Sequence, residues 1–220
     1  MPVLSTVSSS ASHAPAFPAM PPSPTARTGL VTFGPGAPGR AGLEAFIRTV
    51  YREHYAAEVR SFAPTLVGWR GEDGTLVAAA GYRAADPGPL FLERYLHASV
   101  QTLLAAGGAP APDRARIVEV GHLASVRPGA GRRLFAPLAL HLAAQGFDWV
   151  VGTLTEELRL LFARLGIEPM ALGIADPALL GAEAASWGRY YDHRPMVLAG
   201  RIGPALQTLA ARASLTKRPS

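Results

Sequence analysis

The sequence contains no cysteine and almost no lysine. Without cysteine the chain can form no disulfide, no thiolate zinc site and no cysteine nucleophile, and it has no thiol redox chemistry. Lys217 is the one lysine among 21 basic residues, so the net charge of +5 comes from arginine. An arginine bias beside abundant Ala, Gly and Pro reflects genome composition, and we therefore do not expect nucleic-acid binding. A basic surface equally suits an acidic partner protein or a phosphate-rich cofactor.

Long hydrophobic runs are also missing. A membrane-spanning helix needs about 18 uninterrupted apolar residues, and the nearest run, 134–151, is broken by Pro137, His141, Gln145, Gly146 and Asp148. The first 20 residues hold no Lys or Arg and no long apolar stretch, which argues against a secretory signal. We expect a cytoplasmic protein with no stable membrane insertion.

The remaining composition predicts one globular domain. Of the 220 residues, 49% are hydrophobic and 17% are charged, enough apolar material for a core. Residues 1–40 are rich in Pro, Ser and Ala and contain no acid, so we expect a disordered N-terminal segment. The domain is expected at 41–212, followed by a basic C-terminal tail at 213–220.

The hydrophobic periodicity within the domain predicts alternating helices and strands. Helices are expected at 42–59, 91–106, 134–145, 156–165 and 203–212, and strands at 65–70, 75–82, 116–123, 147–153, 170–175 and 195–202. Pro137 is expected in the first turn of its helix, where proline is tolerated. This order predicts an α/β (α+β) fold with a mixed central sheet and helices on both faces.

Four motifs, in order, resemble the thermostable hemolysin family: AGYRA at 80–84, LFLERYL at 90–96, RIVEVGHLAS at 116–125 and WGRYY at 187–191. The resemblance covers about 41–202. It implies a GNAT-like branch of the acyl-CoA N-acyltransferase superfamily, related in shape to acyl-homoserine-lactone autoinducer synthases. The implied activity is transfer of an acyl group from acyl-CoA or an acyl carrier protein to a small amine or amino acid.

In that superfamily a strand runs into a loop that binds the pyrophosphate of the donor at a helix N-terminus. The corresponding loop here is 126–133. Its glycines allow a phosphate to approach the backbone and its arginines supply charge, and the residues concerned are Arg127, Gly129, Gly131, Arg132 and Arg133. The spacing of Arg127, Gly129 and Gly131 departs from the superfamily signature, which weakens the case for CoA in particular.

Two hydroxyl residues flank the expected donor site. Ser125 at the end of its strand and Thr153 on the next strand could bond a phosphate or an acyl carbonyl, or be ordinary loop and strand-end hydroxyls. Residues 149–153 and 158–167 resemble the superfamily's splayed strand and following helix, where the thioester sits. A plain strand–helix unit with a glycine cap would have the same pattern.

Glu119 lies in the most apolar predicted strand, where an unpaired carboxylate is costly to bury. It needs a partner or a function: either it deprotonates or holds the acceptor amine, or it pairs with Arg83 or Arg116. His122 follows at the strand end as a second base or ligand donor, or as a turn cap. The resemblance to autoinducer synthases favours the catalytic interpretation for Glu119, whereas both interpretations of His122 stay open.

The acceptor side is expected around Arg83, Glu93 and Tyr95, with Arg83 able to hold a carboxylate. A solvated helix face is the alternative. Tyr191, in the aromatic motif 187–191, is the candidate general acid for the leaving thiolate, although core packing of these aromatics is equally consistent with the pattern.

No metal site is expected, because the six histidines are scattered and no acidic cluster accompanies them. The interpretation favoured by the sequence is an acyltransferase. The alternatives are a membrane-active protein, as the family name implies, and a binding module that has the fold without the chemistry.

Overall fold

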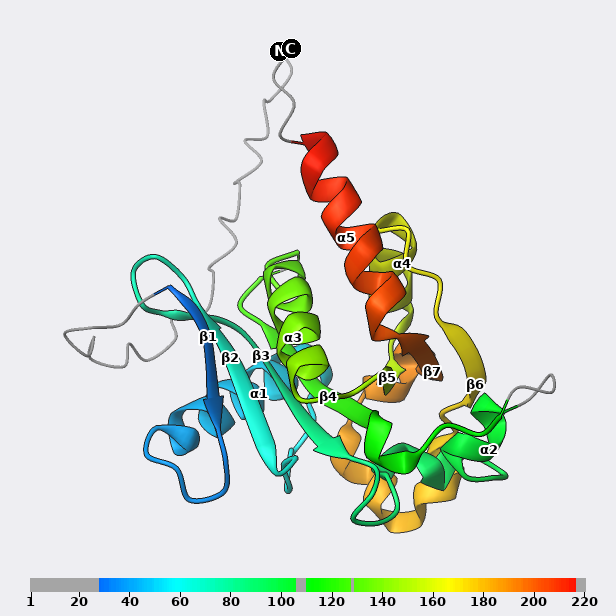
Figure 1. Cartoon of the computed structure of the whole chain (residues 1–220). Helices are drawn as coiled ribbons and strands as arrows, with labels where there is room; N and C mark the ends of the chain where they lie inside the picture. The colour runs from blue at the N-terminus through cyan, green and yellow to red at the C-terminus, as the bar shows by residue number, and fades with distance from the viewer. Residues whose placement is uncertain (1–27, 106–109, 128, 217–220) are drawn as a thin grey trace, which may run out of the picture.

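A computed structural model describes residues 28–105, 110–127 and 129–216. Its centre is a seven-stranded sheet with the order β1-β2-β3-β4-β5-β7-β6 (Figure 1). The strands are β1 (Gly29–Phe33), β2 (Thr65–Arg70), β3 (Leu76–Ala84), β4 (Ile117–Ser125), β5 (Trp149–Leu154), β6 (Met170–Ile174) and β7 (Met196–Arg201). All neighbours are antiparallel except β4 and β5, so the sheet is mixed as predicted.

Helices cover both faces of the sheet (Figure 1). The α-helices are α1 (Arg40–Tyr55), α2 (Val100–Leu104), α3 (Arg132–Ala144), α4 (Glu156–Arg164) and α5 (Ile202–Thr216). The 3₁₀ segments are η1 (Phe91–Tyr95), η2 (Arg114–Arg116), η3 (Pro177–Trp187) and η4 (Tyr190–His193).

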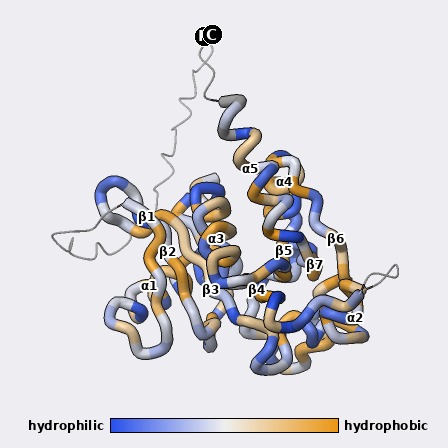
Figure 2. Tube along the Cα trace, in the orientation of Figure 1, coloured by the Kyte–Doolittle hydropathy of each residue, from blue (hydrophilic) through white to orange (hydrophobic). Residues whose placement is uncertain are grey.

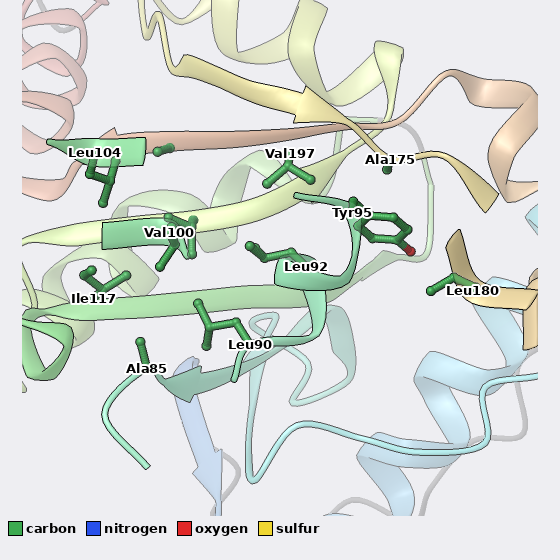
Figure 3. Close-up of a cluster of buried hydrophobic side chains, with 12 residues drawn as sticks. Ala85, Leu90, Leu92, Tyr95, Val100, Leu104, Ile117, Ala175, Leu180 and Val197 are labelled. Carbon is green, nitrogen blue, oxygen red and sulfur yellow. The ribbon is translucent and has the colours of Figure 1, made fainter. Parts of the chain in front are cut away.

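One face of the sheet carries α1 at one end and η1 with α2 at the other. Apolar residues of α1 recur every three or four positions, and Leu43, Ile47 and Val50 are buried against this face. The residues of η1 and α2 form a second buried cluster on the same face. Figure 3 shows Leu92, Val100 and Ile117 in this cluster, with the Tyr95 hydroxyl on the side away from Leu92.

The opposite face carries α3 and α5. Leu134, Leu138 and Leu142 of α3 pack with Ile202 against Val118 and other residues of the central strands. Figure 2 shows hydrophobic residues along β2 and hydrophilic residues in the turn between β2 and β3. The core therefore consists of two layers, one on each side of the sheet.

Three expectations about elements are wrong. Residues 29–33, expected within the disordered segment 1–40, form edge strand β1, because β2 supplies the hydrogen-bonding partner that a short sequence cannot indicate. The helix expected at 91–106 is instead η1, a break and α2, because the Glu93 carboxylate accepts the N–H groups of Leu90 and Val100 and holds a turn between them. Pro137 lies in the second turn of α3, not the first.

The ends of the chain fit the expected boundaries only in part. Helix α5 continues to Thr216, so residues 213–216 of the expected tail are helical. The rest of that tail, and residues 1–27 of the expected disordered segment, lie outside the described residues.

Candidate active site

A cavity of about 190 Å³ opens between α1, η1 and η4 on the face of the sheet that carries α1. Its floor is β3, β4 and β5. Its walls come from the C-terminal end of α1, residues 58–63, η1, and residues 183–191. The cavity brings together six of the predicted site residues, namely Arg83, Tyr95, Glu119, His122, Thr153 and Tyr191. They come from five separate segments, which meet because β3, β4 and β5 are neighbours in the sheet and η1 and η4 pack over them.

Glu119 lies at the floor of this cavity and is 8% exposed. One carboxylate oxygen accepts the N–H of Phe91 at 2.9 Å and the other accepts the N–H of Leu92 at 3.0 Å. Burial raises the pKa of Glu119, while these bonds and the Arg83 charge oppose the rise. The carboxylate therefore orients the start of η1 and still has lone pairs with which it can accept a proton.

Arg83 stands opposite Glu119 on the neighbouring strand β3, as its register partner. Its Nε lies 3.6 Å from Oε2 of Glu119, which is an ion pair but not a hydrogen bond. Of the two partners that the sequence offered to Glu119, the structure selects Arg83, since Arg116 pairs with Asp148 at 2.8 Å. The floor of the cavity therefore has one cation and one anion side by side. The other charged lining residues lie in the walls and are paired, Arg60 with Glu58 at 2.8 Å and Glu183 with Arg94 at 2.6 Å.

His122 occupies a β-bulge in β4, at a φ of 52°. Such an extra residue re-aims the strand and its side chains. Nε2 contacts the carbonyl oxygen of Ser61 at 3.1 Å, and Nδ1 has no hydrogen-bond partner among the described residues. A Cβ at Gly81 would lie 3.0 Å from Nδ1, so this nitrogen faces the backbone of β3. Burial lowers the pKa of His122 to about 4.

Aromatic residues form the wall opposite β4. The hydroxyls of Tyr95 and Tyr191 lie 2.7 Å apart and form a hydrogen-bonded pair at the cavity. Burial raises the pKa of both, so both stay protonated at neutral pH. The indole Nε1 of Trp187 is buried without a hydrogen-bond partner among the described residues. The hydroxyl of Tyr190 donates to the carbonyl oxygen of Thr153 at 3.2 Å.

The predicted donor loop lies between β4 and α3, outside this cavity. The Ser125 hydroxyl donates to the carbonyl oxygen of Arg127 at 3.2 Å, and Gly129 has a φ of 79°. The N–H groups of Ala130, Arg132, Arg133 and Leu134 each donate to a carbonyl three residues earlier. The backbone at the start of α3 is therefore largely hydrogen-bonded within the loop, and the amide cradle expected there is mostly occupied.

The side chains of this loop are better placed than its amides to hold an anion. Arg127, Arg132 and Arg133 are all exposed, and none forms an ion pair among the described residues. Gly131 packs against Ser125, whose side chain a Cβ there would meet at 3.6 Å.

Glu93 does not line the cavity. Its carboxylate accepts the N–H groups of Leu90 and Val100, both at 2.8 Å, and pairs with Arg114 at 2.8 Å. These hydrogen bonds lower the pKa of Glu93 against the opposing effect of burial, so it stays ionised. Glu93 therefore organises the loop that carries Tyr95 and does not itself reach the acceptor position.

A second cavity, of about 320 Å³ and mainly apolar, lies on the other face of the sheet between α3, α4 and α5. Phe135 and Phe162 stack at 4.8 Å in its wall. The resemblance indicated only the part of this cavity formed by 149–153 and 158–167, because the remaining lining residues look like ordinary core residues of separate helices and strands. Only the structure shows that the helices leave a space between them.

The two cavities share lining residues where the pairing of β4 and β5 ends. These parallel strands pair from Ile117 with Trp149 to Glu119 with Val151. Val120 and Leu123, which follow on β4, line both cavities. At this point a Cβ on Gly152 would lie 2.7 Å from the carbonyl oxygen of Val120, so glycine permits the close passage of the two strands.

Comparisons with known proteins agree with this geometry. The model of the family described as thermostable hemolysin matches residues 33–206. A search of proteins with curated functions finds no significant match. Among the described residues, no helix has the length and apolar character needed to cross a bilayer.

Solved structures with the same fold include several enzymes. TofI, crystallised with an inhibitor and MTA, has a TM-score of 0.56 at 18% identity, over 83% of this chain and 96% of its own. FeeM, an N-acyl amino acid synthase from uncultured soil microbes, has a TM-score of 0.54 at 15% identity, over 85% of this chain and 99% of its own. BjaI, a CoA-dependent acyl-homoserine lactone synthase crystallised with SAM and isopentyl-CoA, has a TM-score of 0.56 at 16% identity, over 88% of this chain and 92% of its own.

Proposed function

The chain belongs to the thermostable hemolysin family, and from this premise and the geometry of its two cavities we propose that it transfers an acyl group from an acyl thioester to an amine. One observation carries the proposal. A cavity with a buried carboxylate and a mainly apolar cavity lie on opposite faces of the sheet and share Val120 and Leu123 as lining residues, beyond the last residue pair of β4 and β5. A thioester at that point would have its acyl chain on one side and its amine acceptor on the other.

The apolar cavity suits the acyl chain of the donor. Its volume of about 320 Å³ leaves space for roughly ten water-sized groups, which corresponds to a chain of medium length. The donor's phosphates would bind the exposed arginines Arg127, Arg132 and Arg133. Acyl-CoA and an acyl carrier protein both offer such phosphates, and a carrier protein adds an acidic surface that suits the same arginines.

In the proposed reaction the amine nitrogen attacks the thioester carbonyl carbon. A C–N bond forms and the C–S bond breaks, giving an amide and a thiolate. The ammonium form of the acceptor must first lose a proton, and Glu119 is placed to hold the ammonium and accept that proton. Its raised pKa makes it a stronger base than an exposed glutamate.

The leaving thiolate takes a proton in turn. Tyr191 is protonated at neutral pH and its hydroxyl is held by Tyr95, so it can give its proton to the thiolate. The attacking nitrogen loses its second proton as it becomes the amide, and that proton restores the Tyr191 hydroxyl. We assign His122 a positioning function, because its accessible nitrogen is engaged by Ser61 and its pKa of about 4 keeps it neutral.

The proposal is tested by measuring free thiol release from acyl-CoAs and acyl carrier proteins of several chain lengths, with pooled amino acids or polyamines as acceptors. Intact-mass detection of the amide identifies the product. We expect thiol release that requires both a donor and an amine. Leakage of dye from liposomes, with no turnover of any donor and acceptor pair, would contradict the proposal and favour a membrane-active protein.

Substitution of Glu119 needs a matched control. Glu119→Gln turns an amide NH₂ toward the N–H of Phe91 or Leu92, so it removes the proton acceptor and one hydrogen bond of η1 together. Glu119→Asp keeps a carboxylate on a shorter side chain. We expect Gln to lower kcat by about 100-fold or more and Asp to retain part of it, while thermal unfolding shows both variants folded. Equal losses in the two variants would assign Glu119 a structural role only.

A further inference from the structure

The ion pair of Arg83 and Glu119 is incomplete. The two residues face each other across β3 and β4, but their closest atoms remain 3.6 Å apart. Both oxygens of Glu119 accept backbone N–H groups from η1, which hold the carboxylate away from the guanidinium. No hydrogen bond to Nη1 or Nη2 of Arg83 occurs within the part of the chain that the structure describes.

A guanidinium with a free pair of N–H groups is a specific receptor for a carboxylate. Beside it, Glu119 is a receptor for an ammonium. The cavity thus presents a cation and an anion next to each other, which is the charge pattern complementary to a zwitterion. A simple amine or a polyamine would satisfy Glu119 but would leave Arg83 without an anion and add positive charge beside it.

The size and lining of the cavity restrict the rest of the ligand. A volume of about 190 Å³ leaves space for roughly six water-sized groups. Phe91, Tyr95, Trp187 and Tyr191 contribute aromatic surface around this space. Such walls suit an apolar side chain better than a charged one.

We propose, on the basis of the proposed acyl transfer, that the acceptor is a small α-amino acid with an apolar side chain, whose carboxylate binds Arg83 and whose ammonium binds Glu119. Arg83 is then the residue that selects the acceptor class. The product is an N-acyl amino acid with a free carboxylate. A larger ligand with the same head group, such as the SAM bound in the BjaI structure, is the competing acceptor.

Binding without any donor tests this inference separately from catalysis. Isothermal titration calorimetry of the full chain would use L-leucine, L-phenylalanine, L-phenylalanine methyl ester, phenethylamine and SAM. We expect both amino acids to bind at one site. The ester and phenethylamine, which lack the carboxylate, should bind at least roughly tenfold more weakly, because each loses a hydrogen-bonded ion pair.

Two arginine variants complete the experiment. Arg83→Gln should bind the amino acid and its ester with equal affinity, whereas Arg60→Gln should keep the discrimination, because Arg60 lies in the cavity wall but is paired with Glu58 at 2.8 Å. Thermal unfolding checks that both variants are folded, and the ligand series on the unaltered chain is decisive by itself.

Three results would overturn the inference: equal binding of acid and ester to the unaltered chain, retained discrimination in Arg83→Gln, or SAM binding more tightly than either amino acid. The outcome is distinguishable from that of the proposed function. Thiol release with an amine that has no carboxylate would contradict the zwitterion site and leave acyl transfer intact. Amino-acid binding without turnover of any donor would contradict acyl transfer and leave the zwitterion site intact.

Discussion

At the scale of single residues, the site depends on how the protein controls protonation. Glu119 and His122 are separated by two positions in β4, yet burial shifts the pKa of the glutamate upward and that of the histidine downward. Both shifts favour the neutral form, because burial penalises charge of either sign. Their functions differ because hydrogen bonds differ: Glu119 faces the cavity with lone pairs to spare, and Nδ1 of His122 faces the backbone at Gly81.

His122 should make the protein sensitive to acid. Its pKa is about 4 in the folded chain against an ordinary value of 6.5, so the unfolded chain binds the proton more readily. The stability that this contributes is present above pH 6.5 and is lost as the pH falls toward 4. Asparagine tolerates the positive φ of this position, so His122→Asn should reduce the dependence of the free energy of unfolding on pH between 4 and 6.5. Chemical denaturation at several pH values measures this free energy, with His97→Asn as the control.

A constant difference in the free energy of unfolding between the original chain and His122→Asn, across pH 4 to 6.5, would contradict the assigned pKa. An NMR titration of the histidine ring provides an independent measurement.

At the scale of elements, the decisive feature is the parallel pair β4 and β5. The strands pair over three residue pairs and then separate to admit both cavities. Close approach at Gly152 precedes the separation. The opening therefore follows from backbone geometry and does not depend on one side chain.

Gly152→Ala should damage this element. The added Cβ would lie 2.7 Å from the Val120 carbonyl oxygen, and both atoms belong to backbone that can move only with its strand. We expect a loss of about 1–3 kcal/mol in the free energy of unfolding. Gly200→Ala is the matched control, because Gly200 lies in the neighbouring strand β7 with nothing within 4 Å of its Cβ, and it should stabilise by about 0.5–1 kcal/mol.

Urea denaturation measures both glycine variants. If Gly152→Ala is as stable as the original chain, the strands can separate earlier than the structure shows.

At the scale of the whole molecule, the sheet divides two environments. The polar cavity lies on the face with α1 and η1, and the apolar cavity on the face with α3 and α5. A reaction at the opening between them would keep a long apolar chain away from the charged acceptor. Under the proposed function, this separation would let one small domain accommodate both substrates.

Filling the apolar cavity should change the preference for donors of different chain length and leave acceptor binding unchanged. Ala205 of α5 lines the cavity, so Ala205→Phe should lower thiol release from medium-chain donors by roughly tenfold or more and leave short-chain donors nearly unaffected. Gln207→Phe, on the exposed side of α5, is the control and should change neither. Thiol release across a series of acyl-CoAs measures the effect. An equal loss for all chain lengths would place the acyl chain elsewhere.

The amino-acid sequence by itself determined the family, the mixed α/β class and most of the strands, because hydrophobic periodicity and the four motifs are local properties. It also singled out Arg83, Glu119 and Tyr191, whose catalytic or binding roles stay predictions. Only the tertiary structure decided that Arg83 and not Arg116 faces Glu119, that Glu93 supports a loop, and that an apolar cavity lies behind the sheet. Those facts depend on strand register and on helices that meet across the core, which no local pattern encodes.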